Sequence, residues 1–272
     1  MQYTKRLLVC VALLASCFTE AYAAPPQGTK ASGSDLEPNS AFLEDGGPGS
    51  SSASVSFSTF RAEASFDAQS TFLPILRAES EGQDATFDDD RTQAEAEAYQ
   101  VFTSSIAQTI RLDITLDSVV TNGPEGTSGV LSNVYVIGGS GFEVSDTFCS
   151  PGQFTFDGVY LCGSRIAQSE LKPSLNWSNL FNGGDSPSLT DALTFDVSAG
   201  ESFGIYAKLS AGSFQGTADA FNTLSLSFED DTGITVVPEP ASGCLLGMVL
   251  LGLSAVSRRQ QRTIVAGAIA KS

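Results

Sequence analysis

Strict alternation of apolar and polar residues over 110–117 is the feature that most constrains how this chain folds. Isoleucine or leucine occupies every even position of this segment, and a polar or charged residue follows each one. Successive side chains of a β-strand point to opposite faces, so a period of two places the four apolar side chains on one face. The same alternation recurs over 223–228. Both segments therefore predict β-strands that are buried on one side.

Further strand candidates share runs of β-branched, aromatic and leucine residues. They span 55–60, 130–137, 193–197 and 203–209. Clusters of Gly, Asn and Pro separate them, and this spacing is typical of a β-sandwich. We therefore expect an all-β fold, a single antiparallel, jelly-roll-like β-sandwich over residues 54–237, which is long enough to form one core.

The segment 92–100 has two interpretations. Its composition is that of a good helix, which Asp90 would cap. Ala94, Ala96 and Ala98 also alternate with larger residues, as in a strand with one face of small side chains. We predict a strand, and the helix is the alternative.

The N-terminal residues 1–23 have the features of a secretory signal peptide. Lys5 and Arg6 precede an apolar run, and Ala21-Tyr22-Ala23 provides the small residues that signal peptidase requires before Ala24. We expect export and cleavage by signal peptidase. Residues 24–53 are rich in Gly, Pro and Ser and poor in apolar residues, so we expect a flexible leader there.

The C-terminal region combines an apolar run with polar flanks of a defined kind. Residues 241–256 are apolar but include three glycines, and they are too few for a comfortable permanent span. Arginines after the run would hold that end in the cytoplasm, so we expect a short helix that inserts transiently in the membrane. The flanking residues are Pro238, Glu239 and Pro240 before the run, and Arg258, Arg259 and Arg262 after it.

This order of features over residues 238–262 resembles the PEP-CTERM sorting signal of Gram-negative bacteria. In that family a membrane protease-transpeptidase, exosortase, recognises the signal, and its substrates reach the surface of organisms that make extracellular polysaccharide. The resemblance implies exosortase as a partner and a cut near Glu239. Passages 94–122 and 195–228 also resemble the interior of PEP-CTERM proteins, whereas residues 263–272 extend beyond the usual end of the signal.

The exported part of the chain is strongly acidic and contains no histidine. Residues 24–237 hold eight Lys and Arg against 29 Asp and Glu. Such a charge repels nucleic acid, which we therefore exclude as a partner. The missing histidine excludes Ser-His-Asp and Cys-His catalysis and nearly every catalytic zinc site. We predict no enzymatic activity and no cofactor.

Two acidic clusters are candidates for calcium binding. They consist of Asp88, Asp89 and Asp90, and of Asp230 and Asp231 next to Glu229. Calcium prefers six to eight oxygen ligands at defined spacing, and neither cluster has the spacing of an EF-hand loop. Solvated loop charge is the alternative interpretation.

Cys149 and Cys162 are the only cysteines between the two terminal segments. A pair in an exported protein predicts a disulfide, and Asp157-Gly158 between them predicts a tight hairpin with Phe156 opposite Val159. A redox-active pair is the alternative, although it would favour Cys-x-x-Cys spacing.

Trp177, the single tryptophan, lies among asparagines and is a candidate for stacking on a sugar ring, with a role as a core or loop anchor as the alternative.

Three functions remain. We expect a non-enzymatic surface or matrix protein that is associated with extracellular polysaccharide, as in a biofilm or floc. The alternatives are a lectin-like carbohydrate-binding module and a polysaccharide-active enzyme that uses paired carboxylates.

Overall fold

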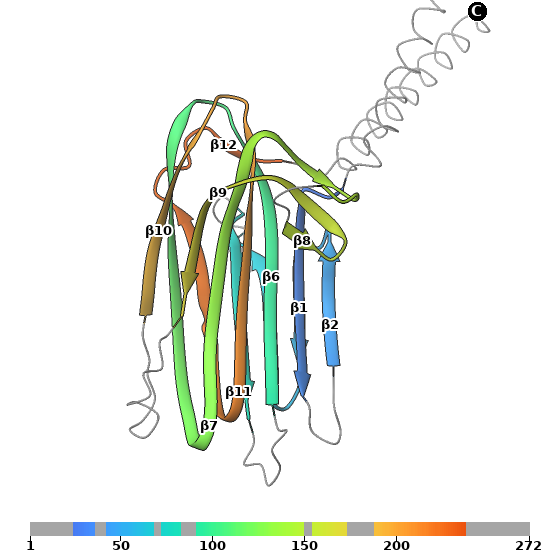
Figure 1. Ribbon diagram of the computed structural model, residues 1–272, viewed down its shortest axis with the longest axis vertical. Helices are drawn as coiled ribbons and strands as arrows, with labels where there is room; N and C mark the ends of the chain where they lie inside the picture. Colours follow the sequence, from blue (N-terminus) through green and yellow to red (C-terminus); the bar gives the residue numbers. More distant parts are fainter. Residues whose placement is uncertain are drawn as a thin grey trace, which may run out of the picture. The chain divides into compact units, whose positions relative to one another are not determined.

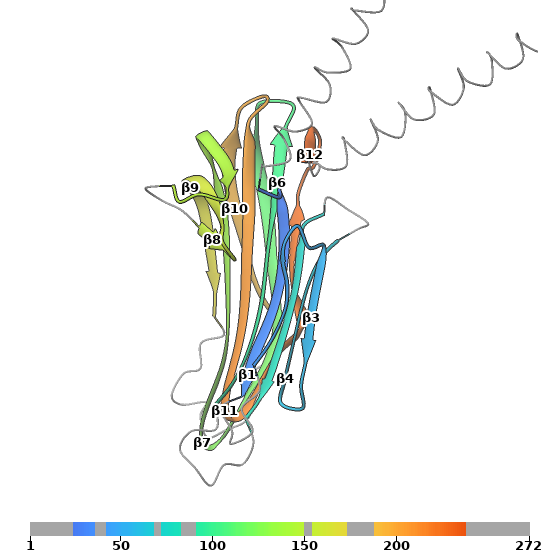
Figure 2. The same cartoon turned by 90° about the vertical axis from the view of Figure 1, so that its right-hand side faces the viewer.

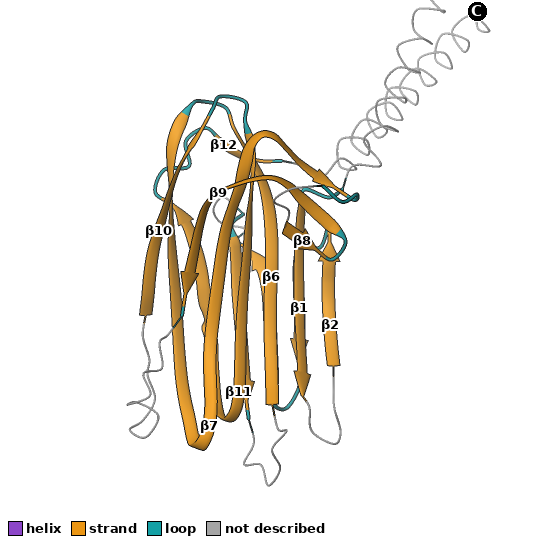
Figure 3. Ribbon diagram, in the orientation of Figure 1, coloured by secondary structure: helices purple, strands orange, loops and turns teal. Residues whose placement is uncertain are grey.

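β-Strands make up all the regular structure that the computed structural model describes (Figure 3). The described residues are 24–35, 42–67, 72–82, 91–149, 154–172 and 188–237. They belong to one unit, Ala24–Val237, and residues 1–23 and 238–272 lie outside the described residues. No helix able to cross a membrane is found within the described ranges.

The strands pair antiparallel throughout. They are β1 (Gln27–Asp35), β2 (Phe42–Pro48), β3 (Ser52–Ser56), β4 (Phe60–Phe66), β5 (Pro74–Glu81), β6 (Arg91–Ser104), β7 (Gln108–Ser145), β8 (Phe154–Phe156), β9 (Val159–Leu171), β10 (Ser188–Val197), β11 (Ser202–Phe228) and β12 (Ile234–Val236).

Two long strands, β7 and β11, fold the sheet into two layers. Leu112–Ile137 of β7 pairs with Gly204–Phe228 of β11, and the register shifts between Phe214 and Gly216, opposite residues 122–127. Figure 1 shows both strands turning back at their lower end. The turn signal at Asn122-Gly123-Pro124 falls at this shift. Each of the two strands therefore contributes one half to each layer.

The front sheet contains β9, the second half of β7, the first half of β11, β6, β1 and β2, with β8 paired to β9. The back sheet contains β10, the first half of β7, the second half of β11, β5, β4 and β3. Figure 2 shows the molecule from the side, with β9 and β3 on opposite sides. The predicted all-β antiparallel sandwich is confirmed.

The main core lies between the two sheets. Ile110, Leu112, Ile114 and Leu116 are all buried in it, as their alternation predicts. Aromatic rings fill one part of the core, where Phe102 stacks on Phe203 with ring centroids 5.6 Å apart. Burial of each such side chain stabilises the fold by about 1.5–3 kcal/mol.

Small side chains fill the core near the bends of β7 and β11. Ser128 and Ser213 are both buried, and their hydroxyl oxygens are 3.0 Å apart. Ala211 and Ala218 flank this pair along β11 and are fully buried. Small residues let the two layers converge, and hydroxyl pairing keeps the polar atoms satisfied there.

The flexible leader predicted for residues 24–53 is wrong. β1, β2 and the start of β3 lie in this segment, and β1 pairs with β6 on one side and with β2 on the other. The glycines of β1 serve close packing: a Cβ on Gly33 would stand 2.2 Å from the ring of Phe60. Composition alone does not distinguish small residues that pack closely from small residues that leave a chain flexible.

The predicted strand over 55–60 is also wrong in its bounds. β3 ends at Ser56 and β4 begins at Phe60. The Phe57 amide donates to the Phe60 carbonyl at 2.8 Å, which closes a tight turn between the two strands.

The strand predicted over 92–100 is confirmed, and the helical alternative is excluded. This segment lies in β6, between β1 and β11, with Ala94, Ala96 and Ala98 fully buried. Pairing on both sides satisfies the backbone and outweighs helix propensity.

Candidate functional site

Both ends of the described chain meet at Val101 in β6. The Val101 amide donates to the Pro26 carbonyl at 2.9 Å, and the Val237 amide donates to the Val101 carbonyl at 3.0 Å. β1 begins opposite Gln100, and β12 ends opposite Phe102. β12 and β1 therefore lie end to end along the same edge of β6, and the position opposite Val101 is shared between the two ends of the chain.

The predicted disulfide joins Cys149 and Cys162, with their Cα atoms 5.9 Å apart. Asp157 and Gly158 both have positive φ, as a type I′ hairpin requires, and Phe156 pairs with Val159 as predicted. The disulfide ties the loop after β7 to β9 in this hairpin.

The hairpin formed by β8 and β9 covers a second, aromatic core on the outer side of the front sheet. The Phe156 ring meets Tyr99 edge-on at 4.8 Å, and the Phe154 ring lies 4.4 Å from Tyr135. The guanidinium of Arg165 lies over the Tyr135 ring at 5.0 Å. The hairpin thus shields one half of this outer face from solvent and leaves the other half to polar residues.

A hydrogen-bonded network occupies the outer face below this aromatic core. Lys208 Nζ donates to Glu95 Oε2 and to Glu97 Oε1, both at 3.0 Å. The Tyr206 hydroxyl donates to Glu97 Oε2 at 2.9 Å, and the Ser210 hydroxyl donates to Glu95 Oε1 at 3.2 Å. Two carboxylates are thereby held in place by one ammonium and two hydroxyls.

The network raises the pKa of two of its members, Tyr206 and Lys208. Burial and the Glu97 carboxylate raise the pKa of the Tyr206 hydroxyl far above its ordinary value. Burial alone would lower the pKa of Lys208, but Glu97 and Glu95 together raise it. Tyr206 therefore stays a hydrogen-bond donor and Lys208 stays charged at neutral pH.

Comparison with known proteins concerns the C-terminal segment. A family model, the PEP-CTERM protein-sorting motif, matches residues 236–259. The chain carries a PEP-CTERM sorting motif. The motif marks the chain for export and for sorting by exosortase. No curated protein matches the chain.

The PEP-CTERM match begins inside the folded sandwich. Its first residue, Val236, is the last residue of β12, and Val237 is the residue whose amide is bonded to Val101. Pro238, Glu239, Pro240 and the arginines of the motif lie outside the described residues, and so does the predicted signal peptide. The matched motif therefore overlaps the end of the last strand, and no linker separates the two.

The calcium candidates are only partly in the described chain. Asp88, Asp89 and Asp90 lie outside it. Asp230 accepts a hydrogen bond from the Thr232 amide at 2.9 Å, and bonds from Thr232 lower the pKa of its carboxyl. Among the described residues no group of three or more His, Cys, Asp or Glu is placed to hold a metal ion. Asp230 thus organises the turn before β12.

Trp177, the predicted sugar-stacking residue, lies outside the described residues. Conversely, sequence patterns did not indicate the network of Lys208, Glu95 and Glu97. Lys208 is opposite Glu97 in the register of β11 and β6. The alternation of each strand predicts that these residues face outward, but only the register brings their charges together.

Proposed function

We propose that this chain is a non-enzymatic protein of the cell surface or extracellular matrix that works in contact with extracellular polysaccharide. The observation that carries the proposal is the start of the sorting motif at Val236, within β12. The motif is fused directly to an acidic sandwich, so the sandwich is what exosortase delivers. Its excess of carboxylates keeps such a body hydrated outside the cell.

Cleavage near Glu239 would leave this sandwich whole. The last backbone bond of the sandwich is donated by Val237, and the predicted N-terminus at Ala24 precedes the bonded carbonyl of Pro26. Both predicted processing steps remove segments beyond the hydrogen-bonded ends. In this proposal, the apolar residues 241–256 hold the chain in the membrane only until exosortase acts.

The intact mass of the protein recovered from outside the cell tests the proposal. We expect a species that lacks residues 1–23 and every residue beyond the Pro238-Glu239-Pro240 tripeptide. A control variant with this tripeptide changed to alanines should keep its tail. Recovery of a mature protein that retains Arg258 to Ser272 would contradict processing by exosortase.

Association with polysaccharide requires a separate measurement. The processed protein should sediment with purified extracellular polysaccharide of its host and should be released when periodate destroys the sugars. An unrelated acidic β-protein should stay in the supernatant. If the processed protein also stays there, contact with polysaccharide is not its function.

A further inference from the structure

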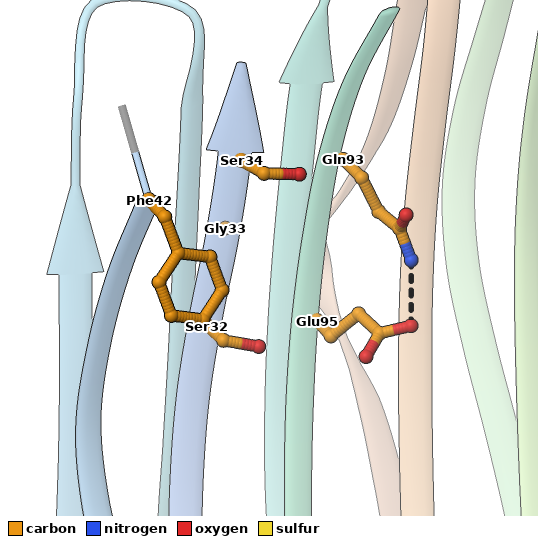
Figure 4. A pocket seen from close by; sticks show the side chains of 6 residues that line it. All are labelled: Ser32, Gly33, Ser34, Phe42, Gln93 and Glu95. Carbon is orange, nitrogen blue, oxygen red and sulfur yellow. Dashed lines mark hydrogen bonds between the residues drawn. The ribbon is translucent and has the colours of Figure 1, made fainter. Parts of the chain in front are cut away.

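A shallow hollow of about 120 Å³ opens on the outer face of the front sheet, beside the Lys208 network. Its lining comes from three neighbouring strands: Ser32, Gly33 and Ser34 in β1, Phe42 in β2, and Gln93 and Glu95 in β6. Figure 4 shows hydroxyl, amide and carboxylate groups along one side and the Phe42 ring on the other. The hollow is thus apolar at one end and polar along its floor.

Phe42 presents its ring to solvent. It is 68% exposed and lies in the edge strand of the front sheet, and Figure 4 shows the ring face-on. Phe148 has the same exposure, but its ring meets Tyr160 at 6.0 Å, whereas no ring contact of Phe42 occurs within the described residues. A large aromatic face left in water can gain burial from a ligand that lies flat on it.

The polar floor is fixed before any ligand arrives. Gln93 Nε2 donates to Glu95 Oε1 at 2.7 Å, and Lys208 and Ser210 hold the Glu95 carboxylate from the other side. The hydroxyls of Ser32 and Ser34 stand beside these groups (Figure 4). Groups held in this way lose little freedom when they bind, so more of their interaction energy appears as affinity.

The cross-strand register extends the hollow into an open row. Phe42 is opposite Ser34, Ser34 is opposite Gln93, and Gln93 is opposite Gly212 in β11. Gly212 is in turn opposite Gly129 in β7. A Cβ at either glycine would meet no atom of the described part of the chain within 4 Å. Among the described residues, nothing at these glycines therefore blocks the row between β2 and β7, and the row would admit a chain rather than only a chain end.

The chemistry of this row matches a saccharide. A pyranose ring has a C–H face, whose slightly positive hydrogens suit the negative face of an aromatic ring, and a rim of hydroxyls. Those hydroxyls can accept from Gln93 and from the serines and can donate to Glu95. The charge of Lys208 compensates the charge of Glu95, but Lys208 also forms an ion pair with Glu97. The acidic body repels a uronate or a sulfated sugar, which leaves a neutral saccharide as the fitting ligand.

We propose that this row binds an internal segment of a neutral polysaccharide, with one sugar ring stacked on Phe42 and its hydroxyls bonded to Gln93, Glu95 and the serines of β1. This assignment rests on the proposed function and names the sugar class and the residues that recognise it.

Binding to defined oligosaccharides tests the assignment. The processed protein is titrated, by calorimetry or saturation-transfer NMR, with linear neutral hexasaccharides of glucose, mannose and galactose, and with hexagalacturonate. At least one neutral hexasaccharide should bind, and hexagalacturonate should bind at least tenfold more weakly. Failure of all three neutral probes to bind, or preference for the uronate, overturns the proposal.

Two variants locate the binding. Phe42→Ala should weaken binding at least tenfold, whereas Phe148→Ala, an equally exposed phenylalanine elsewhere, should change it less than twofold. Gly212→Leu, which fills open space in the row, should also weaken hexasaccharide binding at least tenfold. Unchanged melting temperatures verify that the variants are folded. Equal binding by the wild type and Phe42→Ala overturns the site.

Sedimentation with host polysaccharide distinguishes a failure of this binding site from a failure of the proposed function. If the wild type and both variants sediment equally with host polysaccharide, the row is not the binding site but the proposed function stands. If the wild type itself does not sediment, the proposed function fails.

Discussion

At the residue scale, glycines determine how closely the elements pack. Gly33 faces the buried ring of Phe60, and a Cβ on Gly28 would stand 2.6 Å from the Tyr99 ring. Gly129, by contrast, faces open space. The same residue type therefore has opposite roles at these positions: close contact at two and an open surface at one.

Gly33→Ala should destabilise the protein by about 1–3 kcal/mol, because the added methyl group must displace the Phe60 ring or the backbone of β1. Urea unfolding measures the change. Gly129→Ala is the matched control and should stay within about 0.5 kcal/mol of the wild type. Equal effects of the two substitutions would contradict the packing of β1 against β4.

Tyr206 should make stability fall at alkaline pH. The pKa of its hydroxyl is raised in the folded state, so as the pH rises the unfolded chain loses this proton before the folded protein does, at about pH 10. The contribution of the neutral phenol is complete below that pH and is lost as the pH rises toward the folded value. Lys208, whose pKa is also raised, acts in the same direction.

Urea unfolding between about pH 9 and about pH 11 checks this expectation. The free energy of unfolding should fall less steeply in Tyr206→Phe than in the wild type. Tyr160→Phe removes a phenol outside the Glu97 network and should leave the slope unchanged. Identical slopes in all three proteins would show that the network does not control alkaline stability.

At the element scale, the hairpin of β8 and β9 acts as a cover on the front sheet. Its Phe156 packs on Tyr99 in β6, and its Leu161 is fully buried in the same aromatic core. The disulfide between Cys149 and Cys162 limits how far the loop after β7 can move from this cover. The hairpin therefore depends on both apolar burial and a covalent tie.

Cys149→Ser combined with Cys162→Ser should lower the free energy of unfolding by about 3 kcal/mol, since the bond closes a short loop with a sequence separation of 13. A reductant should destabilise the wild type by a similar amount and leave the double variant unchanged. If the double variant is as stable as the wild type, the disulfide does not stabilise the hairpin.

At the scale of the whole molecule, the two ends of the sandwich form one interrupted strand beside β6. Pro26 supplies a carbonyl and Val237 supplies an amide to the same residue, Val101. A single residue at this position would provide both groups. This arrangement places the two ends of the described chain at one location on the edge of β6.

A circular permutant tests this arrangement. Val237 is joined directly to Gln27, residues 24–26 are omitted, and the chain is opened between Phe57 and Ser58 in the exposed turn after β3. The permutant should fold with an unfolding free energy close to that of the natural order, because the new strand keeps both bonds to Val101. A permutant that forms no disulfide and unfolds without cooperativity would contradict the arrangement of the two chain ends beside Val101.

Local patterns in the sequence predicted much of the fold. Alternation identified the buried faces of β7 and β11, the small-residue alternation at Ala94–Ala98 indicated a strand, and Asp157-Gly158 indicated the hairpin. The sorting motif was also evident, because exosortase reads a short linear segment. These features depend on neighbouring residues alone, so a single sequence contains them.

The remaining features depend on which distant residues become neighbours. The glycines and serines of β1 are strand residues only because β6 and Phe60 provide a surface that requires small side chains. Likewise, Phe42, Ser34, Gln93 and Gly212 form one row only through three strand registers. The sequence by itself determined the alternating strands β6, β7 and β11, the hairpin of β8 and β9, and the sorting signal of this protein. The tertiary structure decided where the chain ends meet and which polar groups share a surface, because register is fixed by pairing across the whole sheet.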